Sequence, residues 1–278
     1  MRAASFSLLS TTLLLVGGAV AGSHGKSAEC SAVDASIVAH SGQPVGSEVK
    51  NGNVTLYITK PDKKNPRTKA RANTAVLYLT DVFGIALPEN KLLADSFARA
   101  GYLTVAPDLF GGSPAPGDIN VPGFNTTAFL AAHGPAATDP IIASTVAYLR
   151  DQLGVTRIAA PGYCFGGRYA FRFVASGRGV DVGYAAHPSL LESGEIAAIA
   201  GPVSIAAADG DTLFNAQARA AAEAVLLGTG QKYQVDLYSG TQHGFAVRAN
   251  VSDESQRWAK EEAFLQAVRW FDRFFVKG

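Results

Sequence analysis

The sequence predicts one α/β domain in which a mainly parallel β-sheet is covered by helices on both faces. Expected strands and helices alternate along most of the 278 residues. The run TAVLYLT (74–80) is continuously apolar, as in a strand buried on both faces, and no change of composition divides residues 53–278. Helical crossovers between parallel strands would place the loops after the strands along one carboxyl edge of the sheet, where such sheets bind ligands.

The first half of the chain contains three expected strands and two expected helices. They are strands at 53–61, 74–80 and 102–108, and helices at 88–100 and 139–152. The segment 53–61 alternates, is rich in β-branched residues and ends at Pro61, which is typical of an edge strand. Pro88 can open the first helix and Gly101 can end it. The charged stretch 61–73 is expected to be a loop.

The longest expected loop, 111–138, is rich in glycine and proline. We expect it to cover or flank the carboxyl edge of the sheet, and a flexible lid is one interpretation.

The second half continues the same alternation and ends in a long amphipathic helix. Its expected elements are strands at 156–163, 181–188, 201–209 and 232–239, and helices at 166–176, 214–227 and 255–276. Strand–helix alternation at this spacing predicts a mainly parallel sheet covered by helices on both faces.

Composition excludes some classes of partner. The chain is 47% hydrophobic with a formal net charge of +1, which is ordinary for a globular domain large enough to bury a sizeable core. Its near-neutral balance, without a basic run, argues against nucleic acid or an anionic membrane as the main partner. A small molecule is the expected partner.

The N-terminus resembles a secretory signal peptide over residues 1–21. Arg2 precedes an apolar run (6–20), and small residues end it before Gly22. A membrane anchor is the alternative, but the apolar run is short and diluted by Ser, Thr and Gly. We expect a secreted protein with an N-terminal lead-in at 22–52 and the catalytic domain at 53–278.

Three Asn-X-Ser/Thr sequons accompany the predicted signal peptide. They begin at Asn53, Asn125 and Asn250. We expect glycosylation at these asparagines if the chain enters a eukaryotic secretory pathway.

The segment PGYCFGG (161–167) contains the pattern Gly162-X-Cys164-X-Gly166 between an expected strand and an expected helix. This is the nucleophile-elbow pattern, with cysteine where serine is more usual. A sharp turn holds the nucleophile in a strained conformation, and the flanking glycines avoid steric clash. The helix N-terminus would favour a thiolate at Cys164.

Two other interpretations of Cys164 remain open. A buried structural cysteine would explain the residue but not the two glycines. The chain has two cysteines, and in an oxidising compartment Cys30 and Cys164 could form a disulfide. An elbow cysteine is poorly placed to reach the lead-in, so we favour the nucleophile.

A thiol nucleophile needs a base, and the base needs an orienting carboxylate. His243 follows the last expected strand, which is the position of the base in elbow-type folds. His24, His40 and His133 lie in the lead-in or the long loop, and His187 comes too early; we expect His187 to line the site or to lie in the core. For the carboxylate we favour Asp211 over Asp209, which could be a turn former.

The oxyanion hole needs two backbone N–H groups. We expect one from Phe165, directly after the nucleophile, and one from Val82 in the loop after strand 74–80. Asp81 in the same loop is expected near the thiol, with a loop cap as its alternative role. Asp81, His187 and Tyr163 are candidates for contact with substrate.

Taken together, these residues resemble the dienelactone hydrolase family of the α/β-hydrolase fold. The matching segments are TDVFGI (80–85), AGYLTVAPDLFGG (100–112), GYCFGG (162–167), the Asp211 loop and HGFAVR (243–248). The resemblance covers most of the mature chain and suggests a secreted fungal-type member.

The resemblance implies a Cys164–Asp211–His243 triad that cleaves small esters or lactones through a thioester, with no cofactor and no metal. Better-known members have glutamate at the position of Asp81 and bind a substrate carboxylate with arginines, for which Arg248 is a candidate here. A non-catalytic binding protein on the same fold is the alternative. A thiol redox protein is disfavoured, because no second cysteine lies near Cys164.

Overall fold

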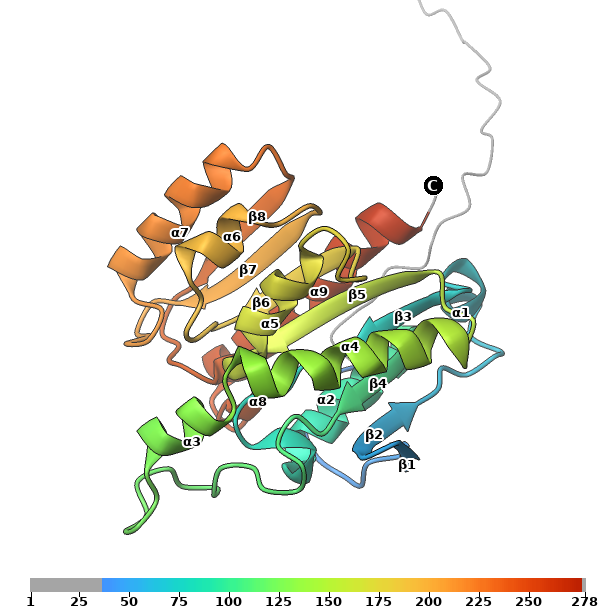
Figure 1. Cartoon of the computed structure of the whole chain (residues 1–278), viewed down its shortest axis with the longest axis horizontal. Helices are drawn as coiled ribbons and strands as arrows, with labels where there is room; N and C mark the ends of the chain where they lie inside the picture. Colours follow the sequence, from blue (N-terminus) through green and yellow to red (C-terminus); the bar gives the residue numbers. More distant parts are fainter. Residues whose placement is uncertain (1–36, 277–278) are drawn as a thin grey trace, which may run out of the picture.

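An eight-stranded sheet forms the centre of the protein in the computed structural model, which describes residues 37–276 (Figure 1). The strand order is β1-β2-β4-β3-β5-β6-β7-β8. β1 and β2 pair in antiparallel fashion, β2 is antiparallel to β4, and the other pairings are parallel. The strands are β1 Ser47–Asn51, β2 Val54–Thr59, β3 Thr74–Leu77, β4 Leu103–Pro107, β5 Arg157–Tyr163, β6 Val182–Ala186, β7 Val203–Ala208 and β8 Tyr233–Tyr238.

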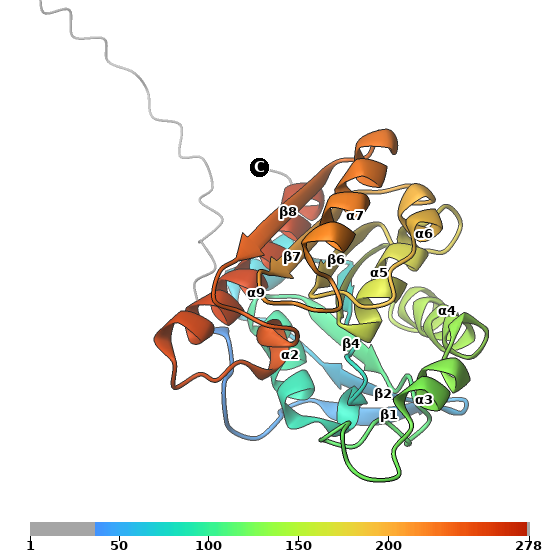
Figure 2. The same ribbon diagram turned by 90° about the vertical axis from the view of Figure 1, so that its left-hand side faces the viewer.

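Helices cover both faces of the sheet (Figures 1 and 2). One apolar layer joins the sheet to α2 and α9, and the other joins it to α4, α5 and α7. The helices are α1 Pro66–Ala70, the 3₁₀ turn η2 Gly84–Ala86, α2 Pro88–Arg99, α3 Thr126–Ala132, α4 Pro135–Asp151, α5 Phe165–Val174, α6 Ser193–Ala197, α7 Ala216–Gly228, α8 Phe245–Arg248 and α9 Glu254–Phe275. The predicted fold class is confirmed.

The antiparallel edge of the sheet differs from the prediction. The segment 53–61 was expected to be the edge strand, but β2 lies between β1 and β4. β1 falls in the expected lead-in at 22–52. Its sequence, SEVKN, is polar because it lies at the exposed edge of the sheet, so it lacks an apolar pattern.

Four short helices also occupy segments without a predicted helix. α1 lies in the expected loop 61–73, α3 lies in 111–138, and α6 and α8 follow β6 and β8. Local caps start three of them: Asn65 accepts from the Arg67 amide at α1, Asn125 accepts from the Ala128 amide at α3, and a reciprocal Glu192–Glu195 capping box precedes α6. α4 begins earlier than predicted, at Pro135, with Pro140 inside it.

Close backbone packing shapes the turn between β5 and α5. Cys164 has φ 51° and ψ −112°, a conformation rarely adopted by residues with a side chain. A Cβ at Gly162 would lie 2.2 Å from the Gly166 carbonyl oxygen, and one at Gly166 would lie 2.3 Å from the Leu79 carbonyl oxygen. The Gly166 amide also donates to the Thr80 carbonyl at 3.1 Å. Both glycines are therefore required by contact with backbone rather than by their own φ.

Some predicted features lie outside residues 37–276, among them the signal peptide, His24 and Cys30. Within the described part of the chain, no helix is long and apolar enough to cross a membrane. Cys164 carries a free thiol. Asn53, Asn125 and Asn250 are all exposed.

Gly166→Ala is expected to lower the free energy of unfolding by about 3 kcal/mol or more, because the new methyl group meets immobile backbone at Leu79. Gly194→Ala in α6 is the matched control, since a Cβ there meets no atom within 4 Å. Urea unfolding measures both variants. Equal stability of Gly166→Ala and wild type would contradict the packing account.

Candidate active site

The carboxyl edge of the parallel strands brings together three side chains from distant parts of the sequence. Cys164 follows β5, Asp211 follows β7 and His243 follows β8. His243 Nδ1 lies 2.9 Å from Asp211 Oδ2. Asp209, the alternative carboxylate, instead accepts from the amides of Gly240 and Thr241 and shapes a turn. Of the two aspartates, Asp211 therefore orients the imidazole.

Burial and pairing act in opposite directions on the pKa values of Asp211 and His243. Burial alone would raise the pKa of Asp211, but the hydrogen bond and charge of His243, with the Phe214 and Leu213 amides, lower it. Burial likewise opposes the charged form of His243, yet the bond to Asp211 and the nearby Cys164 sulfur raise its pKa from 6.5 to about 9. At neutral pH His243 is therefore an imidazolium.

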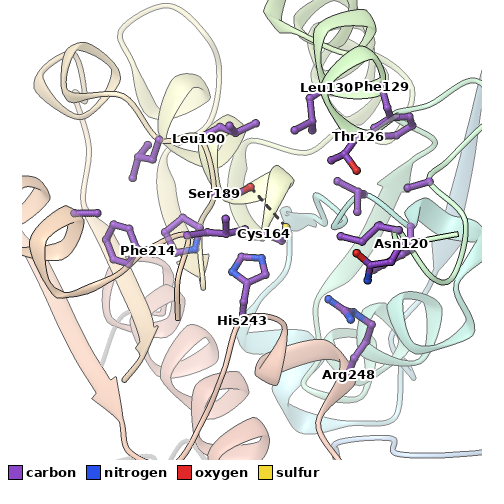
Figure 3. A pocket seen from close by; sticks show the side chains of 18 of the residues that line it. Asn120, Thr126, Phe129, Leu130, Cys164, Ser189, Leu190, Phe214, His243 and Arg248 are labelled. Carbon is purple, nitrogen blue, oxygen red and sulfur yellow. Dashed lines mark hydrogen bonds between the residues drawn. The ribbon is translucent and has the colours of Figure 1, made fainter. Parts of the chain in front are cut away.

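The thiol of Cys164 is nearly buried at the N-terminus of α5. Its Sγ lies 3.6 Å from the Ser189 hydroxyl, and the Ser189 amide donates to the Cys164 carbonyl at 3.0 Å. His243 Nε2 is buried and has no hydrogen-bond partner among residues 37–276. Figure 3 shows the His243 ring next to Cys164, opposite Ser189. The His243 ring and the N-terminus of α5 therefore both lie beside the Cys164 sulfur.

Phe165 and Val82 are the two residues predicted to supply the amides of an oxyanion hole. Phe165 is the first residue of α5, so its N–H has no carbonyl of its own helix to bind. Val82 lines the cavity that also contains Cys164. The contact between Gly166 and Leu79 fixes the loop of Val82 against the elbow.

A cavity of about 790 Å³ opens above Cys164, His243 and Ser189. On one side of Cys164 lies a lining that we call the α7 arm. It consists of Leu190, Leu191, Ser193, Ile196, Leu213, Phe214, Ala218, Ala221 and Ala222. Figure 3 shows Leu190 and Phe214 on this side and Asn120, Thr126 and Phe129 on the other.

The other side of the cavity is formed largely by the segment 115–130, which includes α3. This segment falls within the long expected loop, which flanks the sheet edge as expected. Arg248 lines this side as well. Its Nε lies 3.3 Å from Asp81 Oδ2, and its guanidinium lies 4.7 Å from the centre of the Phe83 ring.

Asp81, one of the candidates for substrate contact, does not line the cavity. It is fully buried and caps its own loop, accepting from the Phe83 amide and the Asn90 side chain. Burial raises its pKa, although Asn90 and Arg248 oppose the shift. Asp81 therefore contributes to the cavity by binding Arg248, which lines it.

Tyr163 and His187, the other two such candidates, also lie outside the lining. Both point into the core: Tyr163 stacks on Tyr78, and the His187 ring centre lies 5.1 Å from that of His243. Burial lowers the pKa of His187 far below its ordinary value, so this imidazole is neutral. These two residues support the site from beneath rather than contact substrate.

Ser189 and the α7 arm were not predicted from the sequence. Ser189 directly follows the expected strand 181–188, and this position at the carboxyl edge was the available signal. The arm combines residues from several loops and one face of α7, so no local pattern marks it.

The model of the dienelactone hydrolase family matches residues 63–275. A hydrolase named pyvD from Aspergillus violaceofuscus is 41% identical over 238 residues, which cover 86% of this chain and 94% of the relative. The chain belongs to the dienelactone hydrolase family. A hydrolase named tropI from Talaromyces stipitatus is 36% identical over 242 residues, which cover 84% of this chain and 92% of that relative.

Solved structures show the same fold for this member of the dienelactone hydrolase family. A dienelactone hydrolase-like promiscuous phosphotriesterase, P91, from metagenomic libraries has a TM-score of 0.66 and 16% identity, covering 84% of this chain and 100% of its own. The family match, together with relatives named as a dienlactone hydrolase and a carboxymethylenebutenolidase homolog, confirms the enzyme class expected from the sequence, a carboxylic ester hydrolase.

Asp211→Asn is expected to lower the pKa of His243 from about 9 toward or below 6.5, because burial then acts without the opposing carboxylate. NMR titration of the histidine ring protons measures this shift. Asp209→Asn is the matched control, since Asp209 contacts Gly240 and Thr241 instead. The same His243 titration in both variants would contradict the assignment.

The raised pKa of His243 also predicts how stability depends on pH. Its folded value lies above 6.5, so protonation of His243 contributes stability that is complete below pH 6.5 and is lost as pH rises through about 9. Urea unfolding of wild type and His243→Gln across this range should converge toward high pH. A stability difference that does not change with pH would contradict the raised pKa.

Proposed function

We propose that this enzyme hydrolyses carboxylic esters, including lactones, through a thioester formed on Cys164, with His243 as acid and base and Asp211 as its orienting carboxylate. The observation that carries the proposal is the 2.9 Å His243–Asp211 bond beside a free thiol at the start of α5, with Cys164 and His243 lining the same cavity. Because the cavity measures about 790 Å³, the substrate need not be small.

In the first half of the reaction the Cys164 thiolate attacks the ester carbonyl carbon. A bond forms between Sγ and that carbon, and the Val82 and Phe165 amides stabilise the resulting oxyanion. The carbon–oxygen bond to the leaving group then breaks, and the His243 imidazolium gives its proton to the departing oxygen. With a lactone, the leaving hydroxyl stays attached to the acyl group.

In the second half water releases the acid. Neutral His243 takes a proton from water, and the hydroxide attacks the thioester carbon. The carbon–sulfur bond breaks, which restores the Cys164 thiolate beside the His243 imidazolium. Asp211 keeps the imidazole in the orientation that both halves require.

Arg248 is proposed to contact a polar group of the substrate. It lines the cavity, and its side chain is about one-third exposed. Asp81 and the face of the Phe83 ring hold the guanidinium in place.

Cys164→Ala is expected to reduce kcat/KM for p-nitrophenyl acetate by at least about a thousandfold, because the nucleophile is lost. Cys30→Ala, which removes the other cysteine, is the matched control and should retain activity. Equal rates for Cys164→Ala and wild type would refute the mechanism.

We also propose that residues 1–21 direct export and are removed. The charged, apolar and small-residue order of this segment supports the proposal, and the exposure of Asn53, Asn125 and Asn250 is compatible with glycosylation. Expressed with its full sequence in a fungal host, the protein is expected in the medium with an N-terminus near Gly22 and a mass that glycosidase lowers. Retention inside the cell with the first 21 residues intact would contradict this.

A further inference from the structure

We propose that the α7 arm is a binding subsite for an apolar substituent of the substrate, several carbons long and attached close to the scissile carbonyl. This inference rests on the proposed function and specifies its substrate class: esters or lactones with a sizeable alkyl or aryl group.

The chemistry of the arm favours an uncharged, apolar occupant. None of its nine residues is charged, and its polar member is Ser193. The opposite side of Cys164 is also largely apolar, but it includes the charged and polar residues Arg248, Asp118 and Asn120. A carboxylate or ammonium group in the arm would lose its hydration without gaining a partner, whereas an alkyl group would lose unfavourable contact with water.

Small side chains on α7 leave the space that such a group needs. Ala218 and Ala222 are four residues apart and therefore lie on one face of the helix, with Ala221 beside them. Ala222 is buried and Ala218 is half-buried. Larger residues at these positions would fill the arm from the α7 side.

The outer end of the arm carries features that the fold itself does not need. Leu190 has φ 59°, which is unfavourable for a residue with a side chain, and yet it is 46% exposed. Leu213 is 59% exposed. Strained backbone is typical of sites that hold a ligand, and a substituent lying between these two leucines would cover apolar surface that now faces water.

The inner end of the arm adjoins the reacting atoms. Asp211 Oδ1 accepts from the Leu213 and Phe214 amides at 2.8 and 3.0 Å, so the turn that orients His243 also forms a wall of the arm. Ser189, directly before Leu190, lies 3.6 Å from the Cys164 sulfur. A group in the arm is therefore attached near the carbonyl under attack.

The test compares two ester series with the full-length enzyme. One is p-nitrophenyl acetate to octanoate, in which the acyl chain grows; the other is methyl to octyl acetate, in which the alcohol grows. For wild type, kcat/KM is expected to rise by about fourfold per methylene over the first few carbons in at least one series. Ala218→Phe is expected to reduce the octyl-to-methyl or octanoate-to-acetate ratio by at least about tenfold.

Ala220→Phe is the matched control, because Ala220 lies on the same helix, is exposed and does not line the cavity. It should preserve the wild-type ratio. Thermal unfolding verifies that both variants are folded, and Ala218→Val provides a smaller obstruction with an intermediate ratio if Ala218→Phe does not fold.

Two negative outcomes have different meanings. Cys164-dependent hydrolysis without dependence on chain length, or equal ratios in Ala218 and Ala220 variants, would overturn the subsite and leave the proposed function intact. Hydrolysis that persists in Cys164→Ala would overturn the proposed function itself.

Discussion

The active site depends on one steric constraint, the contact between the Gly166 backbone and the Leu79 carbonyl. An added Cβ at Gly166 would lie 2.3 Å from that oxygen, so the first turn of α5 touches the end of the neighbouring strand segment directly. This contact holds Cys164 in its strained conformation above the sheet edge and keeps the Val82 loop beside it. The proposed nucleophile and the proposed oxyanion amides thus take their positions from backbone packing, before any side-chain interaction is considered.

Electrostatic interaction between Asp211 and His243 also stabilises the site. A buried carboxylate and a buried imidazolium would each be unfavourable alone, but Asp211 and His243 stabilise each other's charged forms. The same turn holds Asp211 through the Leu213 and Phe214 amides and forms part of the cavity wall. The proposed chemistry and the proposed substrate subsite therefore share a few residues after β7. In a parallel sheet the loops after β5, β6, β7 and β8 all end at this edge, which explains how segments up to 79 positions apart converge.

The sequence predicted the elements whose patterns are strong, namely the apolar parallel strands, α2, α5, α7 and α9. It missed β1, which is polar because it lies at the edge, and the short helices α1, α3, α6 and α8, which caps and tertiary contacts stabilise. Order along the chain was sufficient to select Cys164, Asp211 and His243 as candidates. It could not show that Asp81 and Tyr163 point away from the cavity, because side-chain direction in a loop or at a strand end depends on neighbours distant in sequence. For the same reason, Ser189 and the α7 arm could not be predicted from the sequence.

The most direct test of the central claim is mass spectrometry of the enzyme after acid quenching during turnover of a p-nitrophenyl ester. Acid slows hydrolysis of a thioester, so the acyl group should be found on the peptide that contains Cys164. We expect a mass increase equal to that acyl group at Cys164 of the wild type. In Cys164→Ser, the same position should carry no acyl group under the same conditions, or should carry it as a much longer-lived oxygen ester. Acylation of Ser189 instead, or continued hydrolysis with Cys164 never modified, would contradict the account.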